Sequence, residues 1–207
     1  MSGQLYRSIT AVNQSAYSGT VWLFQTNKNN PGVVLAWLAQ PIKAGGHAHL
    51  QWAATYNVFW AGQGALPTGT LVNAQQLLPC SASSSPQFAL FQDGSSYTLM
   101  PEGDTDNPGI SFVPAAGVPA NAVSVGVAMD TAAIFAAPVQ PGATLVFPTT
   151  QNTYWIAFSP TPIQPGTVIK PDAVSSAKVA FPPGLYSCQA TYGANGAWAL
   201  QYAAGSF

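Results

Sequence analysis

The sequence predicts an all-β protein of the β-sandwich type, made of two similar halves that arose by internal duplication. Short runs rich in Val, Phe, Tyr, Trp, Thr and Leu alternate with clusters of Gly, Pro, Asn and Ser, a pattern typical of many short strands joined by turns. The 207 residues include 19 glycines and 18 prolines. Because proline lacks the N–H donor of a strand ladder, we expect these prolines in turns and at sheet edges.

Five landmarks recur in the same order in both halves, and this repetition predicts the duplication. The first half has a strand at 19–25, a proline turn at 41–45, an aromatic strand at 56–60, a Gly-Thr strand at 69–71 and a hairpin at 88–100. The second half has the matching landmarks at 124–130, 138–142, 154–158, 166–168 and 188–202. Both hairpins turn at a dipeptide, Asp-Gly or Asn-Gly, that supplies the positive φ angles of a tight turn.

The main asymmetry between the halves is a turn-rich insertion at 27–32 in the first half. The spacing of the landmarks predicts a first β-repeat over 8–100, a connector over 101–122 and a second β-repeat over 123–207. We expect the two repeats to pack together, in one compact domain or in two.

The low charge is the most unusual property of the composition. Only 5% of the residues are charged, whereas a typical soluble domain has about 25%. Five Lys and Arg cannot form the basic footprint that nucleic acid or an anionic membrane surface requires. They also leave few charges to guard sheet edges, and the net charge of -1 provides little repulsion between copies. The composition therefore favours self-association.

The compartment follows from hydropathy and cysteine usage. No run of 18 apolar residues occurs, and no apolar run of secretory type follows the N-terminus. We expect no membrane insertion and no signal peptide, with the protein in the cytoplasm or exported by a leaderless route. Cys80 and Cys188 lie far apart, so two free or buried thiols and a single disulfide in an oxidising compartment are both open.

His47 and His49 are the only histidines, and their spacing on a strand places both on one face. Such a pair can bind zinc or copper when a third or fourth ligand joins it. The alternative interpretation is a solvated polar face. The strand at 143–147 in the second half has no histidine, so nothing in the repeated unit requires one.

Glu102, Asp104 and Asp106 alternate along a turn-rich segment, as the oxygen ligands of calcium loops do. The segment lacks the glycine position and the distal Glu of an EF-hand loop. It is therefore a candidate calcium site, with an acidic surface turn as the alternative.

Sequence signatures of catalysis are missing. There is no Gly-x-Ser-x-Gly elbow, no phosphate-binding glycine loop before a helix, and a single Glu in the chain. We assign no catalytic residues and expect no cofactor. Aromatic residues are frequent, and Trp37 and Trp60 lie in apolar runs that favour the core. The tyrosines better placed to expose a polar edge are Tyr17, Tyr56, Tyr154, Tyr192 and Tyr202.

A family resemblance rests mainly on residues 8–72. The run Val34-Leu-Ala-Trp-Leu-Ala-Gln-Pro-Ile-Lys-Ala-Gly45 resembles the Leu-Ala-Trp-Phe-x-x-Pro-x-x-Pro-Gly segment of RhiA-type rhizosphere-expressed bacterial proteins. Leu50-Gln-Trp52 and Tyr56-Asn-Val-Phe-Trp60 are similar to the two aromatic strands that follow there. The histidines depart from the family, which tends to have Thr or Val at those positions. The resemblance implies an all-β bacterial protein without an established enzymatic activity.

Three functions follow from these observations, and the first is the leading one. It is a non-catalytic protein that assembles with itself into a structural, matrix-like oligomer or fibre. The second is a lectin-like module for carbohydrates, which a shallow groove with an exposed Trp or Tyr beside Asn, Gln or Asp would favour. The third is a metal-dependent enzyme, which requires a third ligand beside His47 and His49.

Overall fold

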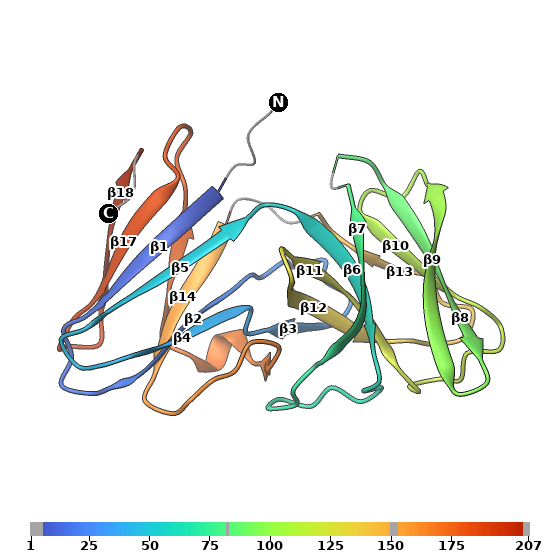
Figure 1. Ribbon diagram of the computed structural model, residues 1–207, viewed down its shortest axis with the longest axis horizontal. Helices are drawn as coiled ribbons and strands as arrows, with labels where there is room; N and C mark the ends of the chain where they lie inside the picture. The colour runs from blue at the N-terminus through green and yellow to red at the C-terminus, as the bar shows by residue number, and fades with distance from the viewer. Residues whose placement is uncertain (1–5, 82, 150–152, 205–207) are drawn as a thin grey trace.

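The computed structural model describes residues 6–81, 83–149 and 153–204, and these residues confirm the all-β prediction. Eighteen strands form four sheets, and the helical structure of the described residues is one 3-10 turn at Pro171–Ala173. The four sheets make two sandwiches that lie side by side (Figure 1). Most of the chain up to β5 lies in the first sandwich, the step from β5 to β6 leads into the second, and the chain returns at β14. The short strands β3 and β15 each cross from the first sandwich to the second and back.

The first sandwich combines two four-stranded sheets. One has the order β18-β17-β1-β5, from β1 (Tyr6–Asn13), β5 (His47–Ala53), β17 (Ser187–Tyr192) and β18 (Trp198–Ala203). The other has the order β16-β14-β2-β4, from β2 (Gly19–Phe24), β4 (Leu38–Ile42), β14 (Thr153–Ser159) and β16 (Ser176–Ala180).

The second sandwich combines a four-stranded and a six-stranded sheet. The smaller sheet has the order β13-β10-β8-β9, from β8 (Pro86–Asp93), β9 (Ser96–Asp104), β10 (Ile110–Pro114) and β13 (Leu145–Phe147). The larger sheet has the order β15-β3-β12-β11-β6-β7. Its strands are β3 (Val33–Leu35), β6 (Tyr56–Ala61), β7 (Ala74–Cys80), β11 (Ser124–Met129), β12 (Ala132–Pro138) and β15 (Val168–Ile169).

The two sandwiches have equivalent topologies. The sheet β18-β17-β1-β5 of the first sandwich corresponds, strand by strand, to the sheet β9-β8-β10-β13 of the second, and the matched strands are eight or nine strands apart in chain order. In both sheets the second and third strands of this order are the parallel pair, β17 with β1 and β8 with β10. The order β16-β14-β2-β4 likewise matches β7-β6-β11-β12. The first sandwich therefore takes four strands from each half of the chain, and the second takes five from each half, with β3 and β15 as its additional pair. A duplicated ancestor predicts this equivalence, and the duplication itself remains a prediction.

The boundaries of the predicted repeats need correction. Residues 101–104 complete β9, and β10 lies between β8 and β13 in a sheet. The segment predicted as a connector over 101–122 is therefore partly core sheet, and the equivalence places the start of the second repeat at β10. The sequence did not reveal β10 because its strand-forming run is only four residues long and lies between Pro108-Gly109 and Pro114.

The Gly-Thr landmarks meet at the junction between the sandwiches. Leu71 forms an antiparallel bridge with Thr167, while the Gly69 N–H donates to the Val168 carbonyl and the Val72 N–H donates to the Gly166 carbonyl. Two equivalent segments that pair with each other occupy the position expected for a twofold axis. The insertion of the first half leads into β3, which pairs with β12 and with β15.

An aromatic cluster fills the core of the first sandwich. Trp37 is fully buried, and its ring centroid lies 5.1 Å from that of Trp52 and 5.8 Å from that of Tyr154. Arg7 is buried beside them: its Nη1 donates to the Tyr154 hydroxyl at 2.9 Å, and its guanidinium lies 5.6 Å from the Phe181 ring centroid. The rings thus provide a π surface for a cation that the interior would otherwise destabilise.

The open sides of both sandwiches are closed by neutral side chains. The Gln76 amide of β7 donates to the Leu99 carbonyl of β9 and accepts from the Leu99 N–H. At the equivalent place in the first sandwich, the Ala180 N–H of β16 donates to the Tyr202 hydroxyl of β18. The edge strands β4, β7 and β9 also contain a proline each, which interrupts the row of donors. Edges that lack charge are therefore still protected, and this weakens the edge-pairing argument for assembly.

Candidate functional site

An open pocket of about 580 Å³ lies over the outer face of the sheet β16-β14-β2-β4. Residues after the end of β2 form one side of it, and the 3-10 turn and β16 form the other. Its lining residues are Gln25, Thr26, Asn27, Lys28, Val34, Thr153, Trp155, Pro171, Asp172 and Lys178. Amide, hydroxyl, ammonium and carboxylate groups therefore surround one large aromatic ring.

Trp155 is held in place from two directions. Its ring stacks on Phe24 with a centroid distance of 6.1 Å and an interplanar angle of 18°, and Phe24 in turn packs on Trp22 at 5.2 Å. The indole Nε1 donates to the Thr26 hydroxyl at 3.1 Å. Because these contacts fix the half-buried ring before any ligand arrives, a ligand that stacks on it does not have to order it.

Three of the eleven charged residues of the chain line this pocket. Lys178 lies opposite Trp155 in the β14–β16 ladder, Lys28 is on the loop after β2, and Asp172 is in the 3-10 turn. Lys170 precedes that turn as its N-cap residue and is exposed. The site therefore has more positive than negative charge and a single carboxylate among its lining residues, so the pair of carboxylates used by glycosidases is not present in that lining.

The second sandwich does not repeat this chemistry. In the equivalent ladder Asn57 pairs with Pro79, where the first sandwich pairs Trp155 with Lys178. The Asn57 amide donates to the Asp130 carbonyl instead of facing a ligand space. An aromatic ring and a cation at one of two equivalent places indicate a function specific to the first sandwich, beyond what packing of the repeat requires.

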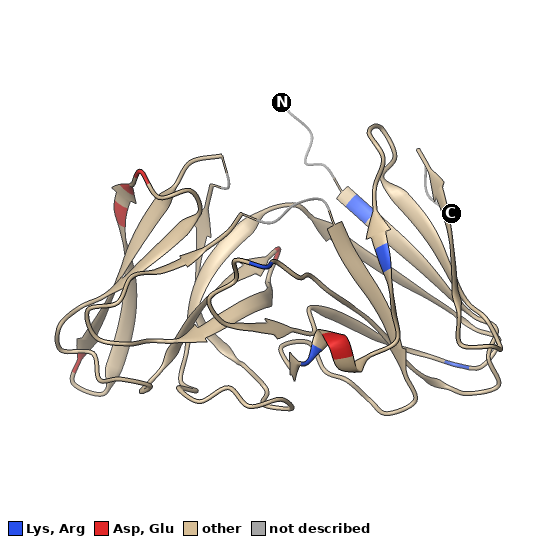
Figure 2. Cartoon of the chain, turned by 180° about the vertical axis from the view of Figure 1, so that it is seen from behind, with Lys and Arg blue, Asp and Glu red and all other residues tan. Residues whose placement is uncertain are grey.

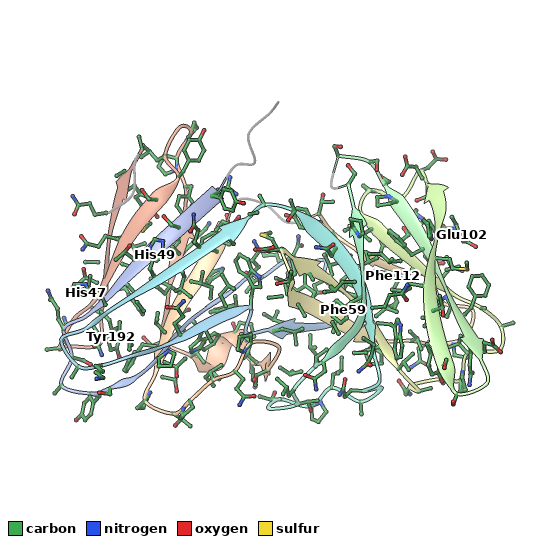
Figure 3. All side chains as sticks on the ribbon, viewed as in Figure 1. His47, His49, Phe59, Glu102, Phe112 and Tyr192 are labelled. Atoms are coloured by element: carbon green, nitrogen blue, oxygen red, sulfur yellow. The ribbon has the colours of Figure 1, made fainter. Side chains whose placement is uncertain are left out.

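The histidine pair lies elsewhere, on β5. His47 and His49 are exposed on the same face, as the spacing predicts, and Figure 3 shows them at the same end of the molecule as Tyr192 and far from Phe59, Phe112 and Glu102. The Thr10 hydroxyl lies 3.1 Å from His49 Nδ1. Within the described ranges, no group of three His, Cys, Asp or Glu residues could hold a metal ion. The structure thus brings these two residues together without a third protein ligand.

The acidic candidates lie at the opposite end of the molecule from the histidines (Figure 3). Glu102 and Asp104 are exposed in the last residues of β9, and the Gln87 amide donates to Glu102 Oε2 at 2.8 Å. Asp106 is exposed in the turn that follows. In the described part of the chain these residues do not belong to a group of three His, Cys, Asp or Glu that could hold a metal ion, and the calcium site stays a prediction beside the acidic surface turn.

The two cysteines are unpaired, on β7 and β17. Burial raises the pKa of the Cys80 thiol to about 11. Burial also raises the pKa of the Cys188 thiol to about 11, although a hydrogen bond with the Gln201 backbone opposes the shift. Both groups are therefore neutral thiols at physiological pH and poor nucleophiles. A second open pocket, of about 420 Å³, includes Cys80 among mainly apolar side chains at the open side of the second sandwich.

The aromatic predictions were right for Trp37 and Tyr17 and wrong for Tyr154. Trp37 is fully buried and Tyr17 is 70% exposed. Tyr154 is buried because it alternates with Trp155 along β14, and the inner face of that strand belongs to the core. Trp155 is a site residue that the sequence alone did not predict. The alternation along β14 was visible in the sequence, but the pairing that brings Lys178 and the end of β2 beside it depends on sheet order.

Fold and pocket together define an all-β protein of two interlocked sandwiches with a polar, Trp-based pocket on one of them. The chain belongs to the RhiA family, whose model matches residues 5–203 and so extends the predicted resemblance over nearly the whole chain. No curated protein and no solved structure matches it. No helix among the described residues is long and apolar enough to cross a membrane.

Proposed function

We propose that this protein binds glycans and that the pocket over Trp155 is the binding site. The observation that carries the proposal is the pre-positioned Trp155 ring surrounded by amide, hydroxyl and charged groups. A sugar ring presents an apolar face to an aromatic platform and hydroxyls around its rim, so it needs both kinds of group. A shallow groove with an exposed Trp or Tyr beside Asn, Gln or Asp is the feature expected of a lectin-like module, and here the half-buried Trp155 lies beside Gln25, Asn27 and Asp172.

The first test is binding of the wild-type chain and of Trp155→Ala to an array of immobilised neutral and acidic oligosaccharides. Loss of a stacking platform is worth about 1–2 kcal/mol, so we expect the affinity for the bound glycans to fall about tenfold or more. Tyr17→Ala is the matched control, because Tyr17 is an exposed aromatic residue outside the pocket lining. An equal response of the two variants would contradict the site, and a wild-type chain that binds no glycan would contradict the function.

Association between copies is the second candidate, and the distribution of charge favours it. Arg7, Lys43 and Lys178 belong to the first sandwich, and Lys28, Lys170 and Asp172 lie in the segments at its pocket that connect it to β3 and β15. Together these six residues have a net charge of +4. The second sandwich contains five carboxylates and no cation, a net charge of -5. Figure 2 shows acidic positions, and no basic ones, at the far end formed by β8 and β9. The second sandwich of one copy is thus complementary to the first sandwich of the next.

Reversal of charge at the acidic end tests this candidate. We expect wild-type protein to associate head to tail at about 20 mM salt and to dissociate at about 500 mM, because exposed ion pairs are screened. Glu102→Lys combined with Asp104→Lys is expected to abolish the association at low salt. Asp172→Asn, which makes the first sandwich more positive, is expected to strengthen it. Sedimentation equilibrium measures all three, and a wild-type monomer at low salt would contradict the candidate.

A further inference from the structure

We infer that the pocket selects acidic glycans, in which a sugar carboxylate is recognised by Lys28 and Lys178. This inference rests on the proposed function and names the class of ligand. Neutral parts of the pocket, above all Trp155 and Asn27, recognise a sugar in either case. The lysines decide which sugars bind best.

Charged residues are rare in this chain, but several of them lie at the pocket. Lys and Arg are 5 of 207 residues, yet two of them line this one pocket and Lys170 lies at its border. These three are among the four cations that are exposed, since Arg7 is buried in the core and Lys43 lies in the turn between β4 and β5. A surface that is otherwise kept soluble by neutral side chains has most of its accessible positive charge around the site.

Lys28 and Lys178 both lie beside the ring of Trp155 in the pocket lining. Lys178 is the direct ladder neighbour of Trp155 on the outer face of the sheet, and Lys28 follows Thr26, the acceptor of the indole N–H. A ring stacked on Trp155 therefore has one ammonium group on the neighbouring strand β16 and another on the loop after β2. An ammonium forms charge-assisted hydrogen bonds with a carboxylate that a hydroxyl cannot match.

The side of the molecule that holds the pocket is positively charged. The first sandwich and the segments at its pocket together have a net charge of +4, which favours an approaching anion, and the net charge of -5 on the second sandwich directs that anion away from the rest of the surface. The same field would attract the acidic end of another copy. We favour the glycan as occupant because the pocket is concave and built around an aromatic ring, whereas the acidic end of β9 offers exposed carboxylates without an aromatic or sugar-like surface.

Matched sugars separate the two parts of the proposal. The probes are tetramers of glucose, mannose and galactose and the corresponding uronates, in which each exocyclic carbinol is oxidised to a carboxylate. Isothermal titration calorimetry of the wild-type chain is expected to give an affinity about tenfold higher for at least one uronate than for its neutral partner. That preference is expected to shrink as salt increases, because it depends on exposed charges.

The variants assign the preference to the two lysines. Lys28→Gln combined with Lys178→Gln is expected to remove the uronate preference and leave the affinity for the neutral tetramer unchanged within about twofold. Lys43→Gln is the matched control, since it removes an exposed cation of the same sandwich outside the pocket. Trp155→Ala is expected to weaken binding of both sugars of a pair.

Each outcome decides one part. If neutral and acidic tetramers bind equally and Trp155→Ala weakens both, the glycan site stands and the acidic preference is overturned. If no uronate binds more tightly than its partner, or if none binds at all, the inference is also overturned. If Lys43→Gln reduces the preference as much as the double variant does, a general field is responsible and the assignment to the pocket lysines is wrong. If the uronates dissociate a salt-sensitive oligomer when they bind, the acidic end of a second copy competes for the same site.

Discussion

Replacement of Trp37 by Ala is expected to lower the free energy of unfolding by about 3–5 kcal/mol. Trp37 is fully buried between β3 and β4, in contact with Trp52 and Tyr154 of the first sandwich. Its Nε1 donates to the Met129 carbonyl of β11 at 3.1 Å, in the second sandwich. The substitution therefore opens a cavity in one core and removes a hydrogen bond to the other, and both effects are unfavourable.

Urea unfolding followed by far-UV circular dichroism measures this loss. Trp37→Phe is the informative companion, because it keeps most of the ring volume and removes the indole N–H. We expect it to lower the free energy of unfolding by less than Trp37→Ala does, by about 1–3 kcal/mol. A change below about 1 kcal/mol for Trp37→Ala would show that the two sandwiches do not share this contact in solution.

Gly126 is expected to be the glycine whose substitution best reveals the equivalence of the two sandwiches. Across the β6–β11 ladder it faces Phe59, whereas the equivalent β2–β14 ladder has Trp22 facing Ala157. The large and the small residue have exchanged strands. A Cβ at position 126 would lie 2.1 Å from the Phe135 carbonyl oxygen and 2.6 Å from Phe59 Cζ. We therefore expect Gly126→Ala to lower the free energy of unfolding by about 1–3 kcal/mol.

A double-mutant cycle separates the two contacts. Phe59→Ala alone is expected to cost about 3–5 kcal/mol, because the ring is fully buried. With Phe59 removed, the added methyl group meets only the Phe135 carbonyl, so the double variant is expected to be less destabilised than the sum of the single variants by about 0.5–3 kcal/mol. If the changes in the free energy of unfolding of the two single variants add up to that of the double variant, or if Gly126→Ala leaves the free energy of unfolding unchanged, the complementary packing is contradicted.

Much of the fold could be predicted from local pattern. Alternation identifies β1, β5 and β14 as half-buried strands, and the Asp-Gly and Asn-Gly turns identify the hairpins β8–β9 and β17–β18. The way in which the two halves of the chain share their strands between the sandwiches could not be predicted in this way. It is determined by the step from β5 to β6, where Ala54 and Thr55 join strands of different sandwiches, and no residue there signals a change of partner.

In the candidate site, too, local patterns could be predicted and the contacts between distant segments could not. His47 and His49 were found because two residues on one strand are local, and the structure gives them no third ligand in its described part. Trp155, Lys178 and Lys28 come from three segments separated in the chain, and each is unremarkable in its own segment. The opposite charges of the sandwiches were likewise hidden by the net charge of -1, because the first sandwich is made from both ends of the chain.

The most direct test of the glycan site is the indole N–H resonance of Trp155 in a ¹⁵N-labelled chain, assigned by its loss in Trp155→Phe. The chain has six tryptophans, so six indole signals report on six places at once. Titration with an oligosaccharide that binds is expected to shift the Trp155 signal and to leave the signal of the buried Trp37 in place. The Trp155 signal shifts because the indole N–H donates its hydrogen bond to Thr26 at the pocket. Saturable binding with an unmoved Trp155 signal would contradict the account and place the glycan elsewhere.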